Sequence, residues 1–178
     1  MACRRTRTLI TVPPLVVTLA VDERAQTAWN ALRRRWFPLE RQLVDAHLTL
    51  FHALPGEHLA TVLADCAEVA DGPFELTVAR VRSLGRGVAL DVESTALLRL
   101  HAALRARWSA WLTRQDAQPF KPHVTVQSKV GPDVAAATLE AVRREPGPGT
   151  ATATGLDVWH YRGGPWEHAA AVPFTAAG

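Results

Sequence analysis

The stretch His47-Leu48-Thr49-Leu50, the first tetrad, occurs again with the same pattern as His123-Val124-Thr125-Val126, the second tetrad. In both, histidine and threonine alternate with apolar residues. Successive side chains of a β-strand point to opposite faces, so the histidine and the threonine of each tetrad share one face. Each tetrad is therefore predicted to be a strand with one buried apolar face and one face that presents an imidazole and a hydroxyl.

Chance does not explain the repetition of the tetrad. With 7 histidines in 178 residues, random placement gives roughly 0.14 stretches of this pattern, and the chain holds two. If the two strands are neighbours, two imidazoles and two hydroxyls share one cleft. Histidine serves as acid or base near neutral pH, and hydroxyls donate hydrogen bonds to oxygens that gain negative charge. This set suits acid–base chemistry on a phosphate, with His47 and His123 as the acid and the base in an order that the sequence leaves open.

The composition is that of a globular protein with a mildly basic charge. The chain of 178 residues is 48% hydrophobic and 21% charged, and its net charge is +3. This balance allows an anionic ligand without requiring nucleic acid. Two cysteines, Cys3 and Cys66, support neither a disulfide framework nor a cysteine-based zinc pattern, which favours a reducing, cytoplasmic setting. No apolar run is long enough to span a membrane, and we expect a cytoplasmic monomer without membrane contact.

The rest of the chain alternates strand and helix patterns. Residues 1–8 are predicted to be a flexible arginine-rich tail; Pro13-Pro14 interrupts the apolar stretch behind it, which favours a first strand over a secretory signal. Strands are predicted at 15–21, 46–52, 123–127, 154–162 and 167–174 and a hairpin at 74–92, with helices after Asp22 and at 57–70, 95–112 and 133–144. Two similar halves, each with one tetrad, predict an α+β fold.

Strand alternation also supplies candidate binding residues. Phe51 shares the predicted face of His47 and could stack on a base or pack at the rim. Gln127 and Lys129 share the predicted face of His123, and Lys129 could meet a phosphate or end in solvent.

Other residues give further candidates. Tyr161 and Arg162 on the last hairpin could contact a substrate. The run Arg33-Arg34-Arg35 is interpreted as a solvated helix end rather than a phosphate contact, because cations favour helix C-termini. Cys66 lies on the apolar face of a helix pattern and is interpreted as a core residue. His101 lies within the helix predicted at 95–112 and is interpreted as a surface or core histidine rather than a catalytic one.

With these motifs the chain resembles the 2H phosphoesterase superfamily, specifically its bacterial 2′-5′ RNA ligase-like members. That family is named for two His-x-Thr/Ser-x motifs with apolar residues at x. The likeness extends to the lead-in Phe120-Lys121-Pro122, to Pro73-Phe74-Glu75-Leu76 before a hairpin, and to the closing strands around Trp166 and Phe174. It covers roughly residues 10–175.

The resemblance implies a two-lobed, pseudo-symmetric α+β fold, with an antiparallel sheet and helices in each lobe and a central cleft, as a single domain over residues 1–178. It implies chemistry on the 2′,3′-cyclic phosphates of RNA ends or cyclic nucleotides, or on 2′-5′ linkages, with neither metal nor cofactor. The family motifs map onto His47, Thr49, His123 and Thr125. Many members carry an arginine soon after each motif, and here Phe51-His52 and Gln127-Ser128-Lys129 stand there instead, which affects substrate choice.

Two alternatives come from other classes. A metal site could use His47, His52 and His58, but an odd separation puts His47 and His52 on opposite faces of a regular strand, and no carboxylate has ligand spacing. An RNA-binding module that kept the fold without turnover stays open. Within the enzyme interpretation, cyclic phosphate hydrolysis and 2′-5′ RNA ligation are not separated by the sequence.

Overall fold

The computed structural model of the chain describes residues 12–145 and 149–175, so the expectation for the tail at 1–8 lies outside the described residues. The α+β class is confirmed. In chain order the elements are β1 (Leu15–Val21), α1 (Glu23–Trp36), β2 (Leu48–Leu54), α2 (Leu59–Val69), β3 (Phe74–Ser83), β4 (Val88–Glu93), α3 (Thr95–Arg107), β5 (His123–Gln127), α4 (Pro132–Arg144), β6 (Thr150–His160) and β7 (Glu167–Pro173).

Several boundaries differ from the predicted ones, most of all in β2, β6 and α3. Strand β2 begins at Leu48, so His47 lies just before it, and β6 begins four residues earlier than predicted. Helix α3 ends at Arg107, and the remainder of the predicted helix, up to residue 112, forms turns. In the described part of the chain, no helix is long and apolar enough to cross a membrane.

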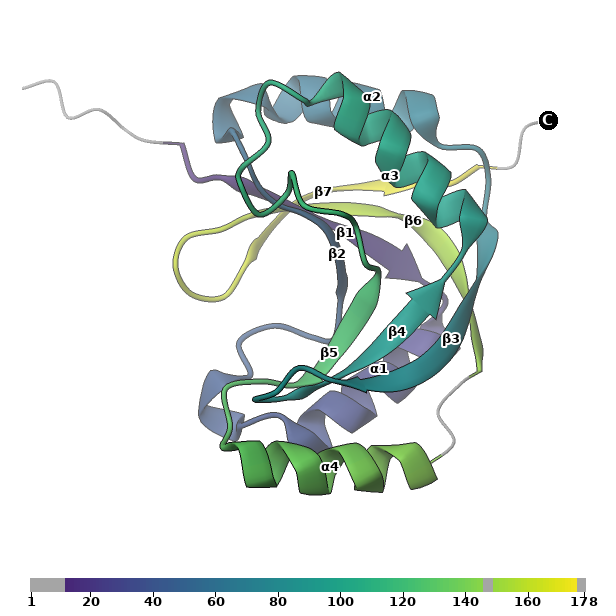
Figure 1. The fold of residues 1–178 in the computed structure, drawn as a ribbon. Helices are drawn as coiled ribbons and strands as arrows, with labels where there is room; N and C mark the ends of the chain where they lie inside the picture. Colours follow the sequence, from purple (N-terminus) through teal and green to yellow (C-terminus); the bar gives the residue numbers. More distant parts are fainter. Residues whose placement is uncertain (1–11, 146–148, 176–178) are drawn as a thin grey trace, which may run out of the picture.

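All strand pairs are antiparallel, and six of the strands close into a ring. The order β1-β2-β5-β4-β3-β6 returns to β1, because β6 pairs with β1 along one edge. On its other edge β6 pairs first with β3, at residues 150–153, and then with β7, at residues 155–160. The result is a barrel-like sheet with α2 and α3 at one end and α1 and α4 at the other (Figure 1).

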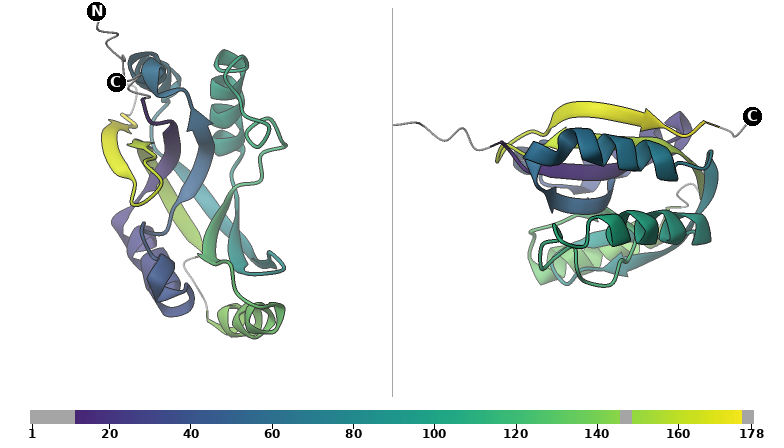
Figure 2. Two further views of the ribbon diagram at one scale, coloured as in Figure 1. Left: turned by 90° about the vertical axis from the view of Figure 1, so that its left-hand side faces the viewer. Right: turned by 90° about the horizontal axis from the view of Figure 1, so that it is seen from above.

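The ring divides into two similar halves. Strands β1, β2, β6 and β7 form the first half and β3, β4 and β5 the second; α1 and α2 lie towards the first half and α3 and α4 towards the second (Figure 2). Between β2 and β5 the halves share only the register pair Leu48 and Val124. The two tetrads therefore meet where the halves are joined.

The apolar residues of both tetrads lie in the core, as predicted. Leu48 and Val124 are fully buried, and Leu50 and Val126 are nearly so. Helix α1 starts at Asp22, whose side chain accepts a hydrogen bond from the Ala25 amide at 3.0 Å. Cys66 is fully buried, which confirms its interpretation as a core residue.

His101 is a core residue as well, held in a stack of rings. Its imidazole lies between Phe51, with ring centres 4.7 Å apart, and Phe120, at 3.8 Å, both nearly parallel to it. Burial lowers the pKa of His101 to about 4, because the charged form loses its hydration. The folded state therefore keeps this imidazole neutral in a pH range where the unfolded chain would protonate it.

Protonation of His101 should weaken the fold in acid. The pKa of His101 is lower in the folded state than in the unfolded chain. Its contribution to the free energy of unfolding is therefore fully present above about pH 6.5 and is lost as the pH falls towards 4. Between pH 7 and pH 5 this residue should remove about 2 kcal/mol from the free energy of unfolding. His101→Phe keeps three stacked rings and should lose about 2 kcal/mol less over that interval, measured by urea denaturation at both pH values. An identical pH dependence in the variant and the wild type would contradict this role.

Candidate active site

The strand register places the four polar residues of the tetrads together. Leu48 on β2 lies opposite Val124 on β5, and both side chains point into the core. In an antiparallel pair with that register, His47 lies opposite Thr125 and Thr49 lies opposite His123. All four side chains are half-buried and share the sheet face that we call the site face.

Both histidine rings are anchored in the same way. The Nδ1 atom of His47 lies 2.7 Å from the carbonyl oxygen of Asp45, and Nδ1 of His123 lies 2.8 Å from that of Lys121. A carbonyl oxygen only accepts, so in each ring Nδ1 carries the proton and donates it. In its neutral form each ring thus keeps an unprotonated Nε2 that can take up a proton.

A β-bulge follows the threonine of each tetrad. On β2, Thr49 pairs with Thr18 of β1 and Phe51 pairs with the adjacent Val17. Leu50 between them is therefore an extra residue. On β5 the partners of Ala89 and Val88 are Thr125 and Gln127, so Val126 is extra. An extra residue reverses the alternation behind it. The residue after each tetrad therefore points into the core.

The predictions for Phe51 and Gln127 are wrong because of these bulges. Phe51 is fully buried and packs against His101 and Trp108. Gln127 is 2% exposed, and its Nε2 donates to the carbonyl oxygen of Trp36 at 3.2 Å and to Thr138 Oγ1 at 2.8 Å. Neither side chain lies on the site face.

The bulge on β2 returns His52 to the side of His47. The His52 imidazole is 45% exposed, and its Nδ1 donates to the Asp116 carboxylate at 2.8 Å, which also accepts the backbone amides of His52 and Ala53. The parity argument that separated His47 from His52 is therefore wrong. Even so, within residues 12–145 and 149–175 no group of three or more His, Cys, Asp and Glu side chains could hold a metal ion.

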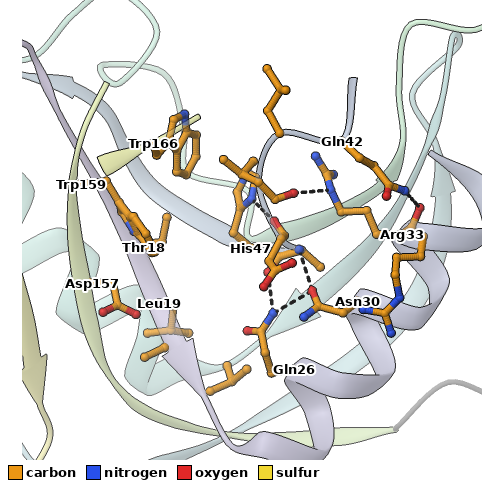
Figure 3. A pocket seen from close by; sticks show the side chains of 17 residues that line it. Thr18, Leu19, Gln26, Asn30, Arg33, Gln42, His47, Asp157, Trp159 and Trp166 are labelled. Carbon is orange, nitrogen blue, oxygen red and sulfur yellow. Dashed lines mark hydrogen bonds between the residues drawn. The ribbon is translucent and has the colours of Figure 1, made fainter. Parts of the chain in front are cut away.

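A pocket of about 640 Å³ opens beside His47. Trp159 and Trp166 lie on one side of His47, and polar side chains of α1 lie on the other (Figure 3). The Trp166 ring centre is 4.6 Å from that of His47 and 6.2 Å from that of Trp159, whose Nε1 donates to Thr18 Oγ1 at 2.9 Å. This aromatic wall fits a flat, uncharged group such as a nucleobase.

Helix α1 fixes the segment that precedes His47. Gln26, Asn30 and Arg33 are spaced four and three residues apart and so share one face of the helix. Asn30 Oδ1 accepts the Ala46 amide at 2.9 Å, and Gln26 Nε2 donates to the Ala46 carbonyl oxygen at 2.8 Å. The backbone next to His47 is thus held by two side chains of one helix.

Arg33 connects the two tetrads. Its Nε donates to the Val44 carbonyl oxygen at 3.2 Å and its Nη1 to that of Thr125 at 2.8 Å, and its guanidinium lies 3.8 Å from the centre of the Phe37 ring. Arg33 is 6% exposed, and no carboxylate of the described residues forms an ion pair with it. The interpretation of the arginine run as a solvated helix end is therefore wrong for Arg33, although Arg34 and Arg35 are exposed.

Burial sets the charge of His47. Loss of hydration lowers the pKa of His47 to about 4, and the nearby charges of Arg33, His52 and His123 act in the same direction. The hydrogen bond to the Asp45 carbonyl oxygen opposes this shift. At neutral pH His47 is consequently uncharged and can act as a base.

The remaining predicted binding residues do not line this pocket. Lys129 is exposed in a left-handed backbone conformation with φ of 62°. Tyr161 is 45% exposed, and Arg162 forms an ion pair with Glu167. Trp159 and Trp166, which line the pocket, were not among the residues predicted to bind a substrate.

The comparisons with known proteins identify the family and the fold. The sequence model of the 2′-5′ RNA ligase superfamily matches residues 21–165. The structure is similar to that of TT0787 from Thermus thermophilus, with a TM-score of 0.66 and 21% identity over 93% of this chain and 100% of the other. It is also similar to Escherichia coli LigT complexed with 3′-AMP, with a TM-score of 0.63 and 20% identity over 92% and 98% of the two chains. No curated protein sequence matches the chain. The fold class predicted from the resemblance is confirmed.

Replacing Arg33 should weaken the link between the tetrads. Lysine keeps the charge but replaces two fixed nitrogens of the guanidinium, which donate to the Val44 and Thr125 carbonyl oxygens, with a single ammonium nitrogen, so Arg33→Lys should lower the free energy of unfolding by about 1–3 kcal/mol. The matched control is Arg34→Lys at the exposed neighbouring position, which should change it by less than about 0.5 kcal/mol. Urea denaturation of both variants measures the difference, and equal stabilities would contradict the role of Arg33.

Proposed function

The chain belongs to the 2′-5′ RNA ligase superfamily, and from this premise we propose that it is a metal-independent phosphoesterase that hydrolyses 2′,3′-cyclic phosphates of RNA or nucleotides to 2′-phosphates. The observation that carries the proposal is the pair of equally anchored imidazoles on the site face, each opposite a threonine hydroxyl. Two imidazoles supply both proton transfers that the reaction needs, so no metal-bound water is required.

The uncharged state of His47 assigns it the role of base. Its Nε2 accepts a proton from water as the water oxygen forms a bond to phosphorus. The bond from phosphorus to the ribose O3′ breaks, and O3′ takes a proton from His123. The products are a free 3′-hydroxyl and a 2′-phosphomonoester, and one water molecule has been added. With the 5′-hydroxyl of a second RNA in place of water, the same exchange forms a 2′-5′ linkage.

The neighbouring side chains are assigned to substrate binding. Thr49 and Thr125 donate hydrogen bonds to the non-bridging oxygens as negative charge builds on them. The ring of His52 is oriented by Asp116 and lies near His47, where it could donate a further hydrogen bond to the phosphate. Trp166 and Trp159 stack on the nucleobase. The complexes of LigT with 3′-AMP and with phosphate support a phosphate-bearing ligand for this fold.

Removing either imidazole should abolish turnover in the presence of a chelator. With a 2′,3′-cyclic nucleotide in EDTA, we expect the wild type to form a 2′-phosphate, identified by phosphorus NMR. His47→Ala and His123→Ala should each lower kcat/KM at least about a hundredfold, the scale of general acid–base catalysis. The control His58→Ala removes a histidine that stacks on Trp111 outside the pocket and should change kcat/KM less than twofold.

The same experiment separates the alternatives. Activity that EDTA removes would contradict the metal-independent mechanism. Tight binding of cyclic-ended RNA without any product would instead favour the RNA-binding module.

The pH dependence should report the base. Because burial lowers the pKa of His47 to about 4, the acid limb of a bell-shaped kcat/KM profile should lie near pH 4 rather than near the ordinary histidine value of about 6.5. Circular dichroism at each pH verifies that the protein is folded. Trp166→Leu removes the ring 4.6 Å from His47, readmits water, and should move the acid limb upward. A wild-type acid limb at 6.5 would contradict the assignment of His47 as the base.

A further inference from the structure

A second pocket, of about 560 Å³, lies on the other half of the sheet. It is lined by β3, β4, the start of α3 and the lead-in to the second tetrad, including Lys121 and Pro122, so it reaches within one residue of His123. The proposed mechanism places no substrate group there.

Strand register continues the site face from His123 into this pocket. Asp91 on β4 lies opposite His123, and Arg80 on β3 lies opposite Asp91. A second row runs parallel to it, since Arg82 on β3 pairs with Ala89, which pairs with Thr125. Two inter-strand steps separate β5 from β3, about 10 Å, a distance that a nucleotide can span.

The two arginines keep donors free for an anion. Arg80 uses Nε to bind one Asp91 oxygen at 2.8 Å, and Arg82 uses Nε to bind the other at 2.7 Å. For the terminal nitrogens of both guanidiniums, the described residues supply no hydrogen-bond partner. The Arg80 side chain is 73% exposed, and Lys121 is exposed beside it. Guanidinium groups fixed at Nε with open terminal nitrogens suit the oxygens of a phosphodiester.

The two walls of the site differ in chemistry although the halves are similar in fold. In the first half β6 is the second strand away from β2 and carries Asp157 and Trp159 on the site face. In the second half the corresponding strand, β3, carries Arg80 and Arg82. One wall therefore suits a nucleobase and the other suits backbone phosphate.

We propose that the pocket lined by Arg80, Arg82 and Lys121 binds the phosphodiester on the 5′ side of the nucleotide that carries the cyclic phosphate. The substrate class is then an RNA oligonucleotide with a cyclic end rather than a mononucleotide. This inference rests on the proposed function, because it assumes that the reacting phosphate lies between His47 and His123.

The test compares two substrates that differ only in chain length. They are adenosine 2′,3′-cyclic phosphate and an adenosine trinucleotide that ends in the same cyclic group. We expect the wild type to prefer the trinucleotide. In Arg80→Gln/Arg82→Gln, kcat/KM for the trinucleotide should fall about tenfold, while kcat/KM for the mononucleotide should change less than twofold. The salt dependence of trinucleotide kcat/KM should weaken by about one unit of log–log slope.

Two controls keep the test specific. Arg143→Gln/Arg144→Gln removes the same charge from exposed positions on α4 and should leave the preference for the trinucleotide unchanged. Arg80→Gln alone leaves Asp91 paired with Arg82, so a reduced preference in this variant cannot come from an unpaired carboxylate.

Equal losses on both substrates, or no loss on either, would overturn the inference while leaving the proposed function intact. If the wild type hydrolyses neither substrate, the proposed function fails, and binding of a fluorescent trinucleotide with a terminal 2′-phosphate decides the pocket's role. Affinity lowered in Arg80→Gln/Arg82→Gln but not in the α4 control would support the phosphodiester subsite, and equal affinities would overturn it.

Discussion

A buried guanidinium ties the two histidine motifs into one site. Arg33 donates to the carbonyl oxygens of Val44 and Thr125, so one planar group fixes the backbone three residues before His47 and within the second tetrad. A charge taken out of water is stable only when its donors are satisfied, and here backbone carbonyls and the Phe37 ring provide that environment. The strands β2 and β5 share only one register pair, so this side chain supplies the connection that the sheet itself provides weakly.

The two halves position their histidine and threonine side chains with the same backbone features. Each histidine ring is oriented by the carbonyl oxygen two residues before it, and each threonine is followed by a β-bulge. The bulge ends the run of polar side chains on the site face after the histidine and the threonine, and the next side chain points into the core. There Phe51 stacks on His101 of α3, and Gln127 donates a hydrogen bond to Thr138 of α4. The symmetry of the backbone thus delivers two imidazoles and two hydroxyls in matching positions.

The proposed mechanism needs two histidines in different roles, and the surroundings of the two tetrads differ. His47 lies beside an aromatic pocket, where burial lowers its pKa and keeps it neutral. His123 lies in a row with Asp91 and Arg80, a charged setting. The backbone around the two histidines is alike, but the side chains around them differ. This difference is the basis for the separate roles that we propose for the two histidines and for the proposed direction of an RNA chain across the site.

The α+β class, the two tetrads as strands and the four polar residues that they present could be predicted from the sequence, because alternation within a strand is a local property that needs no partner. Helical spacing also placed Cys66 in the core, whereas the burial of His101 between two phenylalanine rings followed only from the packing. The other features depend on contacts between distant segments. The bulges that bury Phe51 and Gln127 and bring His52 to the side of His47 depend on register with neighbouring strands. The bond from Arg33 to Thr125 joins residues 92 positions apart, and Trp166 meets His47 because β7 and β6 pair alongside β1 and β2. Such contacts are set by how distant segments pack, and no pattern of neighbouring residues encodes them.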